Sequence, residues 1–172
     1  MGLDTDLKAL CSVQLFEGFP KEQLRLLAFG ATRKFVRPDE IIFRQNDLSE
    51  GGYVVVSGQV DLVVYKDKLE IPLASYMKDS LVGEIALIST NRRVATAISR
   101  ADTELIHIPR ELFHRMLMEY PELAVLLYQR IGTSIKKILT QLEQVQIKLD
   151  NIPNLSALRP SVLTGSGPDK AD

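Results

Sequence analysis

The chain has 172 residues, 45% of them hydrophobic, which is enough for one domain to bury a core without disulfides. Its 21 basic and 22 acidic residues leave a formal net charge of -1, which argues against a strongly basic nucleic-acid or membrane binder. With one cysteine, Cys11, and no apolar run near the roughly 20 residues of a membrane helix, the sequence predicts a cytoplasmic protein without a membrane partner.

Two short helices are predicted at the start of the chain, over Leu3–Leu10 and Pro20–Phe29. In the second helix, proline suits the first helical position, and Leu24, Leu27 and Ala28 share one face. We expect both helices to pack against the rest of the domain.

From Thr32 onwards the hydrophobic pattern changes to that of strands. Segments rich in Val, Ile and Tyr recur with turn residues between them. The predicted strands are Thr32–Val36, Glu40–Phe43, Gly52–Val56, Gln59–Tyr65, Glu70–Tyr76, Ala95–Ser99 and Glu104–Ile108. Many short strands predict a β-sandwich or a jelly roll, and helices at both ends make the fold α+β; the resemblance described below implies a β-roll, a double-stranded β-helix of the jelly-roll type.

After Pro109 the pattern becomes helical again, with a short helix through Met118 and a long one from Pro121 to about Leu149. Apolar residues in steps of four and three predict a coiled-coil seam and a parallel homodimer. The seam residues are Ile131, Ile135, Ile138, Leu142, Val145 and Leu149. The alternative is that this stripe packs on its own domain.

The predicted domain organisation therefore has three parts. Residues 1–120 form the β-roll with its flanking helices, and residues 121–149 form the long helix, for dimerisation or as a lid. Residues 150–172, which contain three prolines and the run Gly165-Ser166-Gly167, are expected to be a flexible tail.

The segment from Gly83 to Ala97 carries the chemistry. An acid opens a short helix, a polar loop follows, and Arg93 precedes a strand of small residues, so helix amides and a guanidinium predict an anion site. Because a carboxylate repels a phosphate, Glu84 fits only if it accepts a hydrogen bond from a neutral group of the same ligand, such as a ribose hydroxyl. The alternative is that Glu84 caps the helix and forms a surface ion pair with Arg93.

The string Gly83-Glu84-Ile85-Ala86-Leu87, followed by a short loop and Arg93-Val94-Ala95, resembles the phosphate-binding cassette of the cyclic-nucleotide-binding domain family. That family includes the catabolite activator protein and the regulatory subunits of cAMP-dependent kinase. Ile42-Phe43-Arg44-Gln45, Tyr53-Val54-Val55 and Ser57-Gly58-Gln59-Val60 resemble its first strands, and the similarity covers about residues 13–149. The resemblance implies a β-roll that contains the cassette, with the long helix closing over the base.

The resemblance also implies roles for the cassette residues. Arg93 would pair with the oxygens of the cyclic phosphate, Glu84 would accept from the ribose 2′-hydroxyl, and Gly83 would let the backbone approach the sugar. The backbone amides of Ala86, Val94 and Ala95 would complete the phosphate cradle, and Arg92 is the competitor for the role of Arg93. The predicted phosphate and ribose site is Gly83, Glu84, Ile85, Ala86, Arg93, Val94 and Ala95.

Three positions depart from the family pattern. Asn46 replaces a common glycine, Asp79-Ser80 stands where Gly-Asp is usual, and Val94 replaces Ala, Ser or Thr. Because the family favours cGMP through a hydroxyl at the position of Val94, the valine favours cAMP as the ligand, with cGMP left open.

Contacts with the base are predicted from the strands and from the long helix. Ile71, Leu73, Met77 and Val82 are candidates in the roll, and Ser134 or Thr133 and Ile138 are candidates on the helix. For the apolar residues the alternative is an ordinary core position, and for the hydroxyls a bond to their own helix.

The resulting hypothesis is a cAMP sensor that signals through its C-terminal helix to a protein partner. The segment from Asp150 to Asp172 is too short for a winged helix-turn-helix, so direct DNA binding is not expected. The alternative is a degenerate domain that acts as a structural dimer without ligand. An enzyme is not supported, because His107, His114 and Cys11 have no catalytic or metal-binding context, and no cofactor or metal is expected.

Overall fold

The computed structural model describes residues 2–133 and residue 140. The chain divides into two units, one ending at Arg130 and the other beginning at Ile131. The predicted flexible tail at 150–172 and the predicted helix end near Leu149 lie outside the described residues. So do the predicted helix residues Ser134, Ile135, Ile138, Leu142, Val145 and Leu149.

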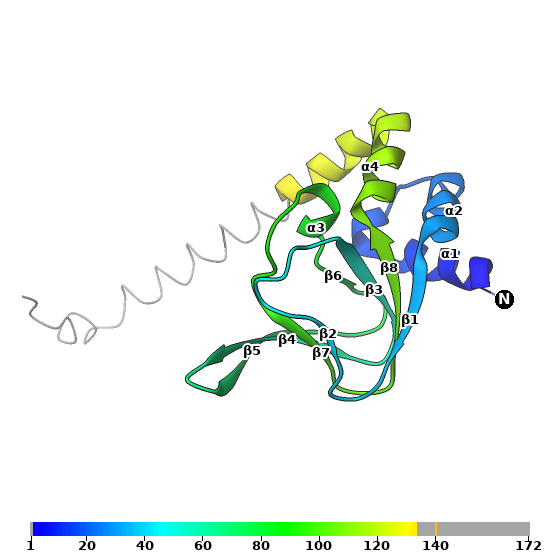
Figure 1. Ribbon diagram of the computed structural model, residues 1–172. Helices are drawn as coiled ribbons and strands as arrows, with labels where there is room; N and C mark the ends of the chain where they lie inside the picture. Colours follow the sequence, from blue (N-terminus) through cyan, green and yellow to red (C-terminus); the bar gives the residue numbers. More distant parts are fainter. Residues whose placement is uncertain (1, 134–139, 141–172) are drawn as a thin grey trace, which may run out of the picture. The chain divides into compact units, whose positions relative to one another are not determined.

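Helices precede and follow the strands, as the sequence predicts (Figure 1). The first elements are α1 (Gly2–Ser12), the 3-10 turn η1 (Gln14–Phe16) and α2 (Lys21–Gly30), and α4 (Arg110–Glu119) and helical residues 121–133 follow the last strand. Pro20 is the extended residue just before α2 rather than its first helical residue, and the turn η1 was not predicted. Among the described helices, none combines the length and apolar character needed to cross a membrane.

In the described residues, eight strands form two four-stranded antiparallel sheets, which make up the predicted roll (Figure 1). The first sheet has the order β1-β8-β3-β6 and the second the order β2-β7-β4-β5. Their bounds are β1 Thr32–Val36, β2 Ile41–Phe43, β3 Gly51–Ser57, β4 Val60–Lys66, β5 Leu69–Tyr76, β6 Leu81–Val82, β7 Thr96–Ser99 and β8 Thr103–Pro109. Only β6, which pairs with Tyr53 and Val54, was missed by the sequence analysis.

The core has one part in the roll and another beneath the helices. The roll core consists of Tyr53, Val55, Val60, Val82, Ala97 and Leu105, with Phe43, Leu62 and Tyr76 packed against it. Among the helices, the ring of Phe16 lies 6.0 Å from that of Phe113, and both are fully buried. Helix α4 is thereby fixed to the N-terminal elements.

Arg100 fixes the hairpin β4–β5 to the roll. Its guanidinium forms an ion pair with Asp61 at 3.0 Å and a second one with Glu70. Burial alone would raise the pKa of Asp61, but hydrogen bonds from Ser75, Gln59 and Arg100 hold that pKa below its usual value. Polar side chains of both strands are therefore tied to Arg100, while Val60 and Val63 of β4 are buried and β5 is exposed along most of its length.

Candidate functional site

The part of the cassette that contains Arg93 runs beside the segment that connects β2 to β3. The N–H of Arg93 donates to the carbonyl of Asp47 at 2.8 Å, and the N–H of Asn46 donates to the carbonyl of Arg93 at 2.8 Å. Further along, Leu48 and Arg92 form an isolated antiparallel bridge. These backbone bonds position Arg93 independently of the contacts that its side chain makes.

Gly83 stands between β6 and the short helix α3 (Ile85–Ile88) in a conformation that favours glycine, with φ +77°. A Cβ atom at this position would lie 2.3 Å from Nη1 of Arg93. The guanidinium thus occupies the space that a side chain would fill, and Gly83 is required for both its backbone angle and its small size.

The Arg93 side chain is buried, with 7% of its surface exposed. Its Nη2 donates to the carbonyl of Gly51 at 2.6 Å, and its Cζ lies 4.0 Å from the centre of the Phe43 ring. Burial lowers the pKa of Arg93, yet an arginine stays charged in proteins. The site therefore contains a buried cation that contacts one carbonyl and one ring face, and its guanidinium has further N–H groups to offer a ligand.

The surface ion pair between Glu84 and Arg93 is not formed. Arg93 is buried, Glu84 is exposed, and Glu84 makes no capping bond at the start of α3. Among the described residues the Glu84 carboxylate has no hydrogen bond or ion pair, so it is available to a ligand.

Two backbone donors beside Arg93 are unused. The N–H groups of Val94 and Ala95 donate to no acceptor in the described part of the chain, although Ala95 is buried. The N–H of Ala86, in contrast, already donates to the carbonyl of Gly83 at 3.1 Å. Unpaired N–H groups next to a guanidinium are the donors that an anion requires.

All seven residues of the predicted phosphate and ribose site line one cavity of about 240 Å³. This volume is small for a ligand site and favours a compact ligand. The cavity is also lined by residues that the sequence analysis did not assign to it: Phe43, Leu62, Leu81, Tyr76, Asn91 and Arg92. The alternation of Val60 and Leu62 with the polar Asp61 was the available signal for the wall contributed by β4.

The predicted base contacts in the roll do not line this cavity. Ile71, Leu73 and Met77 are exposed and do not line the cavity, and Val82 belongs to the roll core. Thr133 is an exposed helical residue of the second unit. Contacts of these residues with a base stay a prediction.

The charges around the cavity suit a singly charged anion that also carries hydroxyl groups. Arg92 and Arg93 contribute two positive charges and Glu84 one negative charge. Arg92 is exposed and donates to the carbonyl of Asn46 at 2.8 Å, which leaves Arg93 as the buried donor. Across the cavity, burial and then the charge of Glu84 raise the pKa of the Tyr76 hydroxyl, which therefore stays neutral.

Two of the departures from the family pattern occupy positions that glycine usually takes. Asn46 has φ +71° and Asp79 has φ +68°. Asn and Asp are the residues other than glycine that adopt this left-handed conformation most readily. Both substitutions therefore preserve the backbone that the cassette needs.

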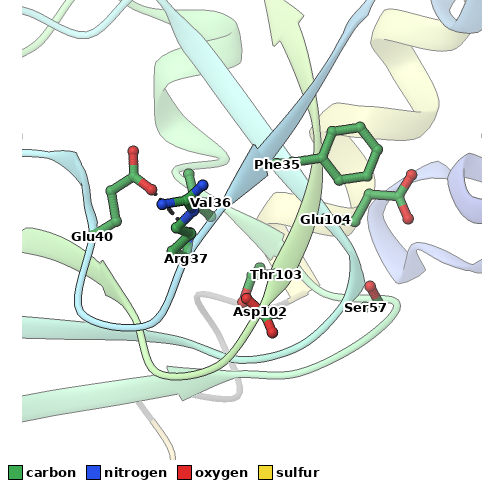
Figure 2. Close-up of a pocket in the computed structure, with 8 residues that line it drawn as sticks. All are labelled: Phe35, Val36, Arg37, Glu40, Ser57, Asp102, Thr103 and Glu104. Atoms are coloured by element: carbon green, nitrogen blue, oxygen red, sulfur yellow. Dashed lines mark hydrogen bonds between the residues drawn. The ribbon is translucent and has the colours of Figure 1, made fainter.

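A second cavity, of about 850 Å³, lies at the ends of β1, β3 and β8 (Figure 2). It is lined by Phe35, Val36, Arg37, Glu40, Ser57, Asp102, Thr103 and Glu104. Its three carboxylates outnumber its one guanidinium, and Glu104 is already paired with Arg33. This cavity repels an anion, and no group of three His, Cys, Asp or Glu side chains in the described residues is placed to hold a metal.

Comparison with known families matches residues 33–120, just over half of the chain, to the model of the cyclic nucleotide-binding domain. The matched range contains the whole cassette. The chain belongs to the cyclic nucleotide-binding domain family.

Solved structures of similar fold include the cyclic nucleotide-binding-like protein of Brucella abortus. It is 36% identical, with a TM-score of 0.60, and the similarity covers 66% of this chain and 97% of that one. The regulatory domain of Toxoplasma gondii PKA, solved with cAMP, is 22% identical with a TM-score of 0.62, over 66% of this chain and 43% of that one. At that identity the likeness concerns the fold of this cyclic nucleotide-binding domain.

A curated relative is an enzyme of much greater length. Lysophospholipase NTE1 of Kluyveromyces lactis is 30% identical over 89 residues, which is 50% of this chain but only 6% of the enzyme. This cyclic nucleotide-binding domain therefore corresponds to a small part of that protein.

Proposed function

We propose that this domain is a cyclic-nucleotide sensor that binds cAMP in the cassette cavity. The observation that carries the proposal is the buried guanidinium of Arg93 beside two unused amides, Val94 and Ala95. This set of donors suits a cyclic phosphate, since a planar guanidinium can meet two of its oxygens. A calorimetric titration with cAMP and cGMP tests the proposal, and heat with neither nucleotide would contradict it.

The remaining cassette residues take supporting roles. Gly83 brings the backbone close to the sugar, Ile85 and Ala86 line the same wall, and the Glu84 carboxylate accepts from the ribose 2′-hydroxyl. Because Glu84 has no partner in the described residues, the ligand hydroxyl does not have to displace an existing hydrogen bond.

Removal of the Glu84 carboxylate is expected to weaken binding only for ligands that carry the hydroxyl. A hydrogen bond to a charged group contributes about 1.5–3 kcal/mol, so we expect Glu84→Ala to lower the affinity for cAMP by about 10- to 100-fold. Affinity for 2′-deoxy-cAMP should change by less than about 3-fold, because the hydroxyl is already absent. The four calorimetric affinities form a double-mutant cycle, and equal losses with both ligands would refute the assignment.

Selectivity between cAMP and cGMP is assigned to Val94, which is 77% exposed and lines the cavity. A threonine there adds a hydroxyl for the guanine amino group, and one neutral hydrogen bond contributes about 0.5–1.5 kcal/mol. We therefore expect Val94→Thr to shift the ratio of affinities toward cGMP by about 2- to 10-fold. Val94→Ala, which adds no hydroxyl, is the matched control, and the same shift in both variants would remove this role.

The sensor is proposed to signal through its C-terminal helix. This helix would form a parallel homodimer that binds a protein effector. The apolar seam from Ile131 to Leu149 supports this, as does the charge balance, which does not favour DNA or a membrane as the partner. Ligand would act by favouring one of two helix arrangements. The rival function, a dimer of degenerate domains without ligand, predicts no heat in the titration.

A further inference from the structure

A line of rings inside the roll connects Arg93 to His107. His107 on β8 is paired with Tyr53 on β3, so the two side chains lie on the same face of the sheet, with ring centres 4.7 Å apart. The Tyr53 ring lies 5.8 Å from that of Phe43, which in turn lies 4.0 Å from Cζ of Arg93.

The environment of His107 favours its neutral form. Its Nε2 atom is buried and has no hydrogen-bond partner among the residues that the structure describes. Burial, then the positive charges of Lys34 on β1 and Arg93, lower the pKa of His107, while the charge of Glu50 opposes them. Lys34 itself lies over the same ring, with Nζ 5.4 Å from the centre of Tyr53.

We propose that protonation of His107 strengthens the binding of an anionic ligand at Arg93. His107 acts as a positioning residue, through the ring of Tyr53. A protonated His107 would be a third cation around the Tyr53 ring, beside Lys34 and Arg93. An anion in the cavity relieves the repulsion among these cations, so proton and anion favour each other's binding. The inference rests on the proposed function, because it needs a ligand that occupies the cassette cavity.

The size of the effect follows from the distances. The separations through the Tyr53 ring place His107 no more than about 11 Å from Cζ of Arg93. A unit charge at that range, in a medium of intermediate dielectric constant and at moderate salt, is expected to change anion affinity by about 3- to 10-fold. The cyclic phosphate keeps its single charge between pH 5.5 and 8, and carboxylates ordinarily titrate below that window.

The test is calorimetry with cAMP at pH 5.5 and at pH 8, at constant ionic strength. We expect the wild type to bind more tightly at pH 5.5, by a factor that rises toward about 3- to 10-fold as the pH falls below the pKa of His107. His107→Gln should show less than a 2-fold difference, whereas His114→Gln should keep the full one. His114 is the matched control because it is the only other histidine and its Nε2 lies 3.0 Å from the carbonyl of Ile88 in the cassette helix.

A second measurement does not depend on a stable variant. The pKa of His107, followed by NMR in the wild type, should rise by about half a unit to one unit when cAMP is added. Equal affinity at both pH values, or a pH dependence that survives in His107→Gln, would overturn the role of His107 and leave the proposed function standing. No binding at either pH would overturn both.

Discussion

Arg93→Ala is expected to lower the affinity for cAMP by about 100-fold or more. Truncation of one partner of a buried, hydrogen-bonded charge pair costs about 2–5 kcal/mol, and here the partner is the ligand phosphate. Arg93→Lys keeps the charge but loses the planar fork and the stacking on Phe43, so we expect a loss of about 10-fold. Isothermal calorimetry measures both variants.

The control for this prediction is Arg92→Ala. Arg92 lines the same cavity but is exposed, and its guanidinium donates to the carbonyl of Asn46. A solvated charge contributes little, so we expect a loss of no more than about 3-fold. Thermal unfolding of each variant separates loss of the fold from loss of the site. Near-normal cAMP affinity in Arg93→Ala, with a large loss in Arg92→Ala, would show that Arg92 and not Arg93 contacts the phosphate.

Gly83→Ala is expected to damage the site and the fold together. The left-handed backbone costs a residue with a Cβ about 1–2 kcal/mol, and the new methyl group would also displace Nη1 of Arg93, which lies 2.3 Å from the ideal Cβ position. We expect stability to fall by about 1–3 kcal/mol and cAMP affinity to fall by about 10- to 100-fold. Urea unfolding and calorimetry measure the two losses.

Gly58→Ala provides a matched comparison for Gly83→Ala. Gly58 has φ +88° in the turn between β3 and β4, and a Cβ there would lie 2.3 Å from Oγ1 of Thr103. Its stability loss should be at least as large, because the Cβ would also lie 2.6 Å from the backbone oxygen of Asp102, yet cAMP affinity should not change, because the turn has no part in the cassette cavity. Equal affinity losses in the two variants would show that Gly83 acts only through stability.

The sequence predicted most of the roll because its signals are local. Val, Ile and Tyr segments between turn residues identified seven strands, with errors of no more than a residue or two at their ends. β6 was missed because it has only two residues, Leu81 and Val82, and two residues carry no period. The sequence analysis identified the cassette residues as one motif because they follow one another closely in the chain.

The opposite wall of the cavity could not be predicted in the same way. Phe43, Leu62 and Tyr76 come from three strands that the sheet order β2-β7-β4-β5 brings together, and this order is a tertiary property. On β5 the residue that lines the cavity is Tyr76, the pairing partner of Val60 on β4, whereas Ile71 and Leu73, the candidates for the base, are exposed.

The contact between Arg93 and the Phe43 ring was hidden for a related reason. Phe43 is an ordinary strand residue in the sequence, 50 positions from Arg93, and no local pattern relates the two. Only the pairing of Phe43 with Ala97 places the ring next to the guanidinium.

The most direct test of the account is an NMR titration of the ¹⁵N-labelled protein with cAMP. The amides of Val94 and Ala95, which have no acceptor in the described residues, should move furthest, and downfield, as they donate to the phosphate. Unchanged Val94 and Ala95 signals, with shifts gathered instead at Phe35 and Glu104 around the second cavity or absent everywhere, would contradict a phosphate site in the cassette.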